Sequence, residues 1–190
     1  MAYGAISDFK GKLKQGGARP SLFNVSIVTS PTGVSIPADH SNKCFTSAIP
    51  GLTITPIEKQ FFGRTVKLPG EMTFGTLSTT FYNSETFDIR RALEDWTDII
   101  NGPESNLGVS GVPSTYSGQV DLTHYGKDGT KGMTFQFRDC WPTEVAAIEL
   151  SYDTVGDMEN FAVTWEYDYY RMLAGVISGQ SVNGTQEGVA

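Results

Sequence analysis

The sequence predicts a mainly β protein, an antiparallel β-sandwich or partial barrel with one flanking α-helix. The clearest observation is a period of two in residues 161–170, FAVTWEYDYY, where aromatic and aliphatic side chains alternate with Thr164, Glu166 and Asp168. Other short segments with strand character are separated by turns rich in glycine and proline. Only residues 83–103 space their apolar side chains as a helix does. At 190 residues, the chain suits one domain with a sizeable core.

The domain is expected to cover residues 21–170, after an N-terminal arm at residues 1–20. Residues 171–190 are low in charge and rich in glycine and serine, so we expect an extension that is flexible or ordered by a partner. No segment has the apolar run of a signal peptide, or the roughly 20 apolar residues of a membrane span. We therefore expect a soluble protein that is not exported by the ordinary route.

The first strand is predicted at about residues 22–29, where apolar side chains alternate with polar ones. Residues 31–42 contain two prolines and a glycine, which predict a loop longer than a compact domain requires. A short strand follows in residues 44–51, CFTSAIPG, and its own proline and glycine stop it.

A projecting hairpin is predicted next. Residues 57–68, IEKQFFGRTVKL, form two apolar and charged arms around Gly63. Residues 72–82, MTFGTLSTTFY, are rich in threonine and aromatics and predict another strand. Because neither face of that strand is cleanly apolar, we expect both faces to be exposed to solvent or to lie at an interface.

One helix is predicted, at about residues 84–101. Asn83 or Ser84 can cap its N-terminus, and the Gly-Pro pair at residues 102–103 ends it. The opposite side of the helix is charged and should face water or a polar contact. The apolar side, at helical spacing, carries Ile89, Leu93, Trp96 and Ile100.

Two further strand pairs follow the loop at residues 104–117. Residues 119–125 and 133–141 predict a hairpin around the turn GKDGTKG. One face of its second strand is expected to hold Met133, Phe135, Phe137 and Trp141. Residues 146–153, AAIELSYD, alternate strictly and predict a strand that turns at residues 154–160 into the last strand. Its apolar row is Ala146, Ile148, Leu150 and Tyr152, and its other row is Ala147, Glu149, Ser151 and Asp153.

The net charge of −7 is unevenly distributed along the chain. Residues 1–91 carry ten Lys or Arg against six acids, whereas residues 139–170 carry eight acids and no Lys or Arg. Tight binding of nucleic acid is excluded, because phosphate affinity comes from Lys and Arg. The same layout permits a basic surface of one copy to meet an acidic surface of the next, in a head-to-tail contact.

No catalytic, metal or cofactor site is predicted. Cys44 and Cys140 are interpreted as reduced apolar residues, with a single bridge between them as the alternative. His40 and His124 have no neighbouring ligand at a metal spacing.

Two turns superficially resemble ligand loops. GKDGTKG fails the spacing of a phosphate loop, and DTVGDME at residues 153–159 lacks the ligand spacing of an EF-hand. A polar hairpin turn explains both better. Glu166 and Asp168 share a strand face, but no His or Arg accompanies them for acid–base chemistry.

Five segments, taken in order, resemble the tail tube protein of contractile-tailed bacteriophages. They are GGARPSLFNVSI, IPGLTITPIEKQFFGRTVKLPGEMTFG, ETFDIRRALEDW, RDCWPTEVAAIELSYDT and NFAVTWEYDYY. The match runs from about Gly17 to Tyr170, and GARPSLF and CWPTEV are its most specific pieces.

The resemblance implies that each domain completes a shared barrel in a hexameric ring, and that rings stack into a hollow, rigid tube. It implies as partners further copies of the chain, together with tail sheath, baseplate and tail-terminator proteins. DNA would pass along the bore without sequence-specific binding. No catalysis and no cofactor are implied, and the protein would be assembled in the host cytoplasm and located in the virion tail.

Other interpretations stay open. A type VI secretion tube or a contractile bacteriocin particle would use the same fold, and a tube-related cap protein would use a similar chain. A monomeric hydrolase on a β-sandwich has almost no support in the sequence.

Two sets of site residues follow as hypotheses. The hairpin is expected to contact an adjoining subunit or ring through Lys59, Phe61, Phe62, Arg64 and Lys67. An acidic set is expected to face either the bore or a neighbouring subunit, and it comprises Glu149, Asp153, Glu166 and Asp168. An acid-rich wall would repel phosphates at short range.

Overall fold

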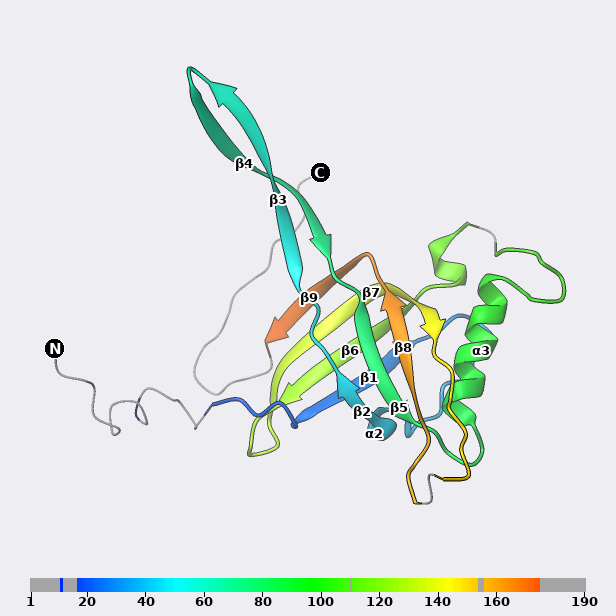
Figure 1. Cartoon of the computed structure of the whole chain (residues 1–190). Coiled ribbons are helices and arrows are strands. Elements are labelled where there is room, and N and C mark those ends of the chain that lie inside the picture. The colour runs from blue at the N-terminus through cyan, green and yellow to red at the C-terminus, as the bar shows by residue number, and fades with distance from the viewer. Residues whose placement is uncertain (1–10, 12–16, 110, 154–155, 175–190) are drawn as a thin grey trace.

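The computed structural model describes residues 11, 17–109, 111–153 and 156–174, which form a main sheet, a projecting hairpin and one long helix (Figure 1). The main sheet has seven strands in the order β1-β6-β7-β8-β5-β2, with β9 also paired to β7. All its pairs are antiparallel, so the predicted fold class is confirmed. Its strands are β1 (Phe23–Thr29), β2 (Cys44–Ser47), β5 (Leu77–Tyr82), β6 (Gly118–Tyr125), β7 (Lys131–Val145), β8 (Asn160–Glu166) and β9 (Tyr169–Ala174).

The core lies between two layers of this bent sheet. Strands β2, β5 and β8 lie across from β1, β6 and β7, and helix α3 (Asp88–Ile100) covers one open side (Figure 1). At the centre, the rings of Trp96 of α3 and Trp165 of β8 meet edge to face with centroids 5.7 Å apart. Neither ring is exposed. The buried residues of both layers and of α3 form one continuous cluster.

Strand β7 bends where Asp139 adopts a left-handed backbone with φ 53°. Before the bend Phe137 is buried, and after it Cys140 and Pro142 are buried while Trp141 is only half-buried. The prediction that Trp141 shares a face with Phe137 is therefore wrong. The bulge inserts one residue, and one extra residue moves every later side chain to the other face.

The last predicted strand is interrupted at the same level. It divides into β8 and β9, which pair with the two halves of β7. At the break, the backbone N–H of Asp168 donates to the carbonyl of Arg138 over 3.2 Å. The predicted buried row Phe161, Val163, Trp165 and Tyr167 is confirmed, whereas Tyr169 is 38% exposed. Strand β9 continues to Ala174, past the predicted domain end, and residues 175–190 lie outside the described residues.

Helix α3 begins later than predicted. Its N-cap is Phe87, a left-handed residue with φ 54° and no side-chain cap, and neither Asn83 nor Ser84 caps it. Residues 83–87 instead form a turn in which the Phe87 N–H donates to the Ser84 carbonyl over 2.9 Å. The predicted apolar side is confirmed, with Ile89, Leu93 and Trp96 fully buried.

The expected strand at residues 72–82 is two strands. The first part belongs to the projecting hairpin, and β5 begins after a break at residues 75–76. Strand β5 has a clean buried face of Leu77, Thr79 and Phe81, so the prediction of two wet or interface faces is wrong there. Thr79 is buried because the indole N–H of Trp165 donates to its hydroxyl over 2.8 Å.

Residues 146–153 are the clearest failure of the pattern. Strand β7 ends at Val145, and the residues after it form no strand despite their strict alternation. Leu150 is 78% exposed and Tyr152 is fully exposed, so the expected inward apolar row is absent beyond Ile148. Arg90 of α3 holds the start of this segment by donating to the Ala146 carbonyl.

The outer edge of β1 is covered by the short helix α2 (His40–Lys43), which interrupts the predicted loop. The Ile27 backbone N–H, which points away from β6, donates to Nε2 of buried His40 over 2.8 Å. Nδ1 of the same ring lies 2.6 Å from the Pro37 carbonyl. Since Nε2 accepts, the proton is on Nδ1 and the ring is neutral. A side chain thus replaces the missing strand partner.

Replacing His40 by Ala should lower the free energy of unfolding by about 1–3 kcal/mol, because the Ile27 N–H would be buried without an acceptor. His124 is the matched control. Its ring donates one hydrogen bond to the Arg19 carbonyl at the exposed end of β6. Urea unfolding should show His124→Ala within about 0.5 kcal/mol of wild type. Equal effects of the two substitutions would contradict the edge-covering role of His40.

Both cysteines are free and buried, which confirms the reduced interpretation. Burial raises the pKa of the Cys44 thiol to about 12. Burial, and secondarily the negative charge of Glu166, raise the pKa of the Cys140 thiol above its ordinary value. Both thiols therefore keep their protons in the folded state at a pH where the unfolded chain loses them.

The folded protein should lose stability as the pH rises above about 9, because only the unfolded state then releases the thiol protons. Below about pH 9 the thiols are protonated in both states, so the folded protein keeps its full stability. Each thiol should lower the free energy of unfolding by about 1 kcal/mol between pH 9 and 10, because the unfolded thiol is only partly ionised at pH 9. Urea unfolding at pH 8, 9 and 10 measures the slope, and Cys140→Ala should reduce it by about half. An unchanged slope in that variant would refute the assignment.

No helix among the described residues is both long and apolar enough to cross a membrane. Residues 113–115 form a short 3₁₀ turn, η2 (Pro113–Thr115), in the long loop before β6. The predicted N-terminal arm lies almost wholly outside the described residues.

Candidate assembly surfaces

The hairpin of β3 (Leu52–Phe61) and β4 (Arg64–Phe74) is a separate two-stranded sheet that projects far from the body (Figure 1). It agrees with the predicted hairpin but begins five residues earlier and ends six residues later. A two-stranded ribbon with no core behind it is marginally stable in water. Phe74 at the end of β4 packs against the body. The other large apolar side chains are between 43% and 93% exposed, and they are Leu52, Ile54, Ile57, Phe61, Phe62, Val66, Leu68 and Met72.

The apolar side chains of the hairpin change faces half-way along it. Near the body, the cross-strand pairs Leu52–Phe74 and Ile54–Met72 share one face. Beyond the pair Pro56–Pro69, the apolar pair Ile57–Leu68 lies on the opposite face, because adjacent residues of a strand point to opposite sides. The hairpin therefore offers an apolar surface to one side near its base and to the other side near its tip.

The change of face is accompanied by a break in strand pairing. Pro56 and Pro69 stand opposite each other, so neither can donate a ladder hydrogen bond. The register shifts between Ile54 and Pro56. Residues 70 and 71 of β4 therefore stand opposite the single residue Thr55 of β3, which is a β-bulge. Figure 1 shows the two strands crossing part of the way along the hairpin. A Cβ on Gly70 would lie 2.4 Å from the Thr55 carbonyl oxygen, so only glycine fits.

The tip is a tight turn with an aromatic residue in an unfavourable conformation. Phe62 has φ 43° and Gly63 has φ 77°, which is the pattern of a turn that favours Asn-Gly. A bulky side chain at positive φ is strained. The Phe62 ring is 93% exposed and meets the Phe61 ring edge to face, with centroids 4.7 Å apart. The tip therefore combines a strained backbone with an aromatic side chain that is almost wholly in water.

The charges of the distal hairpin also divide between its faces. Lys67 pairs with Glu58 across the strands at 3.2 Å, on the face opposite Ile57 and Leu68. Lys59 and Arg64 lie on the apolar face and form no ion pair within the described part of the chain. The predicted interface residues are thus not equivalent. Lys59, Phe61 and Arg64 share one surface, and Lys67 lies on the other.

The predicted acidic set is spread over two segments. Glu149 and Asp153 are exposed on the irregular segment after β7. Glu166 ends β8 half-buried, and Asp168 is exposed in the break before β9. The structure therefore does not bring the four carboxylates into the single stripe that the alternation suggested.

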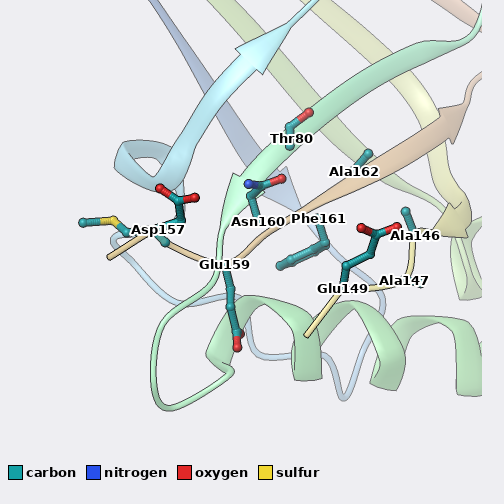
Figure 2. Close-up of a pocket in the computed structure, with 10 residues that line it drawn as sticks. Thr80, Ala146, Ala147, Glu149, Asp157, Glu159, Asn160, Phe161 and Ala162 are labelled. Carbon is teal, nitrogen blue, oxygen red and sulfur yellow. The ribbon is translucent and has the colours of Figure 1, made fainter. Parts of the chain in front are cut away.

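A groove of about 580 Å³ opens beside the start of β8 (Figure 2). Its walls come from the end of β5, the start of β8, and the two segments that flank residues 150–156. Figure 2 shows Asp157 and Glu149 on opposite sides, with the buried ring of Phe161 between them. Glu159 points away and accepts a bond from the Asn83 amide over 2.9 Å. The groove is not predictable from local patterns, because its walls come from two strands and two irregular segments that are separate in the sequence.

The described residues contain no group of His, Cys, Asp and Glu arranged to hold a metal ion. The turn at residues 126–132 is a polar hairpin turn, in which the hydroxyl of Thr130 donates to Asp128 over 2.7 Å. The pKa of the Asp128 carboxyl is lowered by the same hydroxyl. His40 and His124 are each engaged with backbone groups of β1 or its flanks.

A model of the family described as "Phage tail tube protein" matches residues 18–173. The tail tube protein gp19 of Enterobacteria phage T4 is 29% identical over 154 residues, which are 80% of this chain and 90% of the phage T4 protein. The tail tube protein of Serratia phage KSP90 is 24% identical over 166 residues, covering 85% of this chain and 93% of the relative. These matches confirm the resemblance found in the sequence.

Solved structures share the fold at lower identity. The sheath–tube complex of the extracellular contractile injection system PVC has a chain with TM-score 0.57 and 16% identity, covering 90% of this chain and 99% of that one. A chain of the tube-terminating cap of the anti-feeding prophage has TM-score 0.59 and 12% identity, covering 84% and 92%. At such identities the likeness establishes fold alone.

Proposed function

Because the chain belongs to the phage tail tube protein family, we propose that identical copies form hexameric rings that stack into the inner tube of a phage tail. The rings are proposed to surround a bore through which DNA passes to the host. The chain then acts as a structural part of the virion tail, assembled in the host cytoplasm. We propose no catalytic role.

The observation that carries this proposal is the projecting hairpin. In a single copy, only Phe74 at its base packs against the body, and the other large apolar side chains on its faces are in water. Exposed apolar surface of this extent marks a contact with another macromolecule. The contact residues proposed on the distal hairpin are Lys59, Phe61, Phe62 and Arg64. Lys67 supports them through its pair with Glu58.

Unpaired strand edges support ring formation. Among the described residues, strands β2 and β9 each pair on one side only, whereas helix α2 covers the outer edge of β1. An exposed edge recruits another strand, and closure into a ring removes the edges that remain. A barrel built from strands of several copies is wide enough for a channel, because single-chain barrels of 16 to 18 strands already leave one.

The bore is proposed to be electronegative. Asp153, Glu166 and Asp168 are the carboxylates proposed to line it, while Glu149 belongs to the groove beside β8. Fixed negative charge keeps DNA from adhering, because binding depends on neutralising phosphates. A structure of the assembled tube tests this directly, and finding all three carboxylates on the outer wall would overturn it.

Tail sheath, baseplate and tail-terminator proteins are the further partners proposed. Contractile injection systems share this fold, so a bacteriocin-like particle or a secretion tube is the alternative role. The relatives from phages T4 and KSP90 are tail tube proteins, which favours the phage role.

Negative-stain electron microscopy of the purified chain over a concentration series tests the proposal. We expect six-fold rings at low concentration and hollow filaments at high concentration. Sedimentation velocity on the same samples measures the mass of the assembly. A chain that remains monomeric throughout the series would contradict the proposed function.

A further inference from the structure

We propose that the groove between Glu149 and Asp157 is the socket that receives the hairpin tip of a second copy in the next ring. This inference rests on the proposed stacking and adds to it the identity of the receiving surface. It commits to one occupant, the distal hairpin of an identical chain. The chemistry of the two surfaces and their positions on the body support it.

The hairpin supplies an apolar surface with two unpaired cations. On its distal face, Ile57 and Leu68 lie beside Lys59 and Arg64, and Phe62 extends at the tip. Both cations are without an ion-pair partner in the described part of the chain, whereas Lys67 on the reverse face is neutralised by Glu58. The tip therefore needs an apolar partner that carries negative charge.

The groove supplies the complementary surface. Its floor contains Phe161 and Ala162 of β8, and its sides include Ala146 and Met158, the latter 72% exposed. The Glu149 and Asp157 carboxylates form no hydrogen bond or ion pair with described residues, so they are available to a partner. Arg90, which lies over the Phe161 ring, is engaged with Glu94 over 2.6 Å and with the Ala146 carbonyl.

Arg90 also fixes the shape of the groove. Its guanidinium lies over the Phe161 ring, 5.4 Å from the centroid. The same group ties the first residue of the segment after β7 to α3. One wall and the floor are therefore held by a single side chain, so the groove is preformed rather than created by the partner.

The groove and the hairpin lie at opposite ends of the body. Strand β5 starts next to the base of the hairpin, and its far end pairs with the start of β8 at the groove through Phe81–Phe161. Figure 1 shows the hairpin projecting from one end and the start of β8 at the other. A contact between two different patches of identical chains is a head-to-tail contact. Along the tube axis, each copy then still offers a free patch to the next copy. The contact therefore generates the linear repeat that a tube requires.

One tip in one socket is a small contact, since its charges are exposed and screened by salt. The contact gains strength by repetition. Where several copies are held in one ring, the first tip that docks places the others at high effective concentration. Removing the interaction from every copy at once should therefore prevent stacking while the rings themselves persist.

The first test is Phe62→Asn. Asparagine suits the positive φ of this turn better than phenylalanine, so the hairpin should fold at least as well. We expect rings to form as in wild type, and the protein concentration at which tubes appear to rise about tenfold or more. Circular dichroism melting confirms that the body is intact. Normal tube assembly by this variant would overturn the proposal.

The second test exchanges charges between the two surfaces. Arg64→Glu and Glu149→Arg, each alone, should block stacking, and the two together in one chain should restore it. The matched control exchanges the charges of the reverse-face pair, Glu58→Lys with Lys67→Glu in one chain, because it reverses the charge at position 67 but keeps the pair, and it should leave tubes in place. Tubes in Arg64→Glu alone, or no restoration in the double variant, would overturn the assignment of this socket.

The two proposals fail differently. If wild type forms neither rings nor tubes, the proposed function itself is wrong. If wild type forms tubes and the Phe62 and Arg64 variants form them equally well, the function stands and the socket is elsewhere.

Discussion

Substitution of Gly70 by Ala is expected to abolish tube assembly while leaving the body folded. A Cβ at this position would lie 2.4 Å from the Thr55 carbonyl oxygen and 2.8 Å from Cγ1 of Ile57. The backbone oxygen cannot retreat without opening the ladder at the Pro56–Pro69 pair, where hydrogen bonds are already lost. The hairpin would therefore change direction at its middle, and its distal half would no longer reach the neighbouring copy.

The expected effect on stability is small because the hairpin makes few contacts with the core. Thermal unfolding of Gly70→Ala should stay within a few degrees of wild type, while electron microscopy shows no filaments. Gly51→Ala, at the base of the same hairpin, is the control, because its Cβ meets nothing within 4 Å. Filaments of ordinary length from Gly70→Ala would show that the bulge can be repacked and that the direction of the distal half is not critical.

The sequence predicted the hairpin but not the change of face within it. Apolar and charged arms around Gly63 are a local signal, and local signals specify a hairpin. The change of face depends on which residue of β4 stands opposite Pro56, and that register follows from a bulge. Pro69 and Gly70 permit a bulge here, but they do not specify which residue of β3 it faces. The same reasoning applies to Asp139, where one extra residue exchanged the buried faces of β7.

Residues 146–153 show a different limit of sequence reasoning. Strict alternation reports that two faces differ, but a strand also needs a partner for its backbone. The ladder of β7 with β8 ends near Ala146, whose N–H donates to the Ala162 carbonyl over 2.9 Å, and the chain then diverges. The groove arises from that divergence. The periodicity of one segment cannot reveal the groove, because the groove is a space between segments.

Thr79 explains why the threonine-rich composition of β5 wrongly predicted a strand without a buried face. A threonine-rich segment suggested a wet strand, yet Thr79 is fully buried at the centre of the molecule. Its hydroxyl accepts the indole N–H of Trp165 over 2.8 Å and lies 3.5 Å from the Val163 carbonyl. A buried polar residue is acceptable when its partner is also buried, and the partner is 86 residues away in sequence.

Trp165→Ala should destabilise the folded chain severely. The side chain is fully buried and packs edge to face on Trp96, and truncation of a buried tryptophan costs about 3–5 kcal/mol. That is a large part of the total stability of an ordinary domain, about 5–15 kcal/mol. We expect the variant to unfold at a much lower urea concentration and to assemble poorly for that reason alone. A midpoint close to wild type would contradict the central role of this tryptophan pair.

Thr79→Val separates hydrogen bonding from packing at the same position. Valine has nearly the same shape, so the expected loss of about 1–3 kcal/mol comes from leaving the Trp165 N–H buried without an acceptor. Thr46→Val, on the exposed side of β2, is the control and should change the free energy of unfolding by less than about 0.5 kcal/mol. In a Trp165→Phe background no N–H remains to be orphaned, so the cost of Thr79→Val should largely disappear. A cost that persists there would mean that the threonine acts through its weaker contact with Val163, and that the tryptophan is positioned by packing alone.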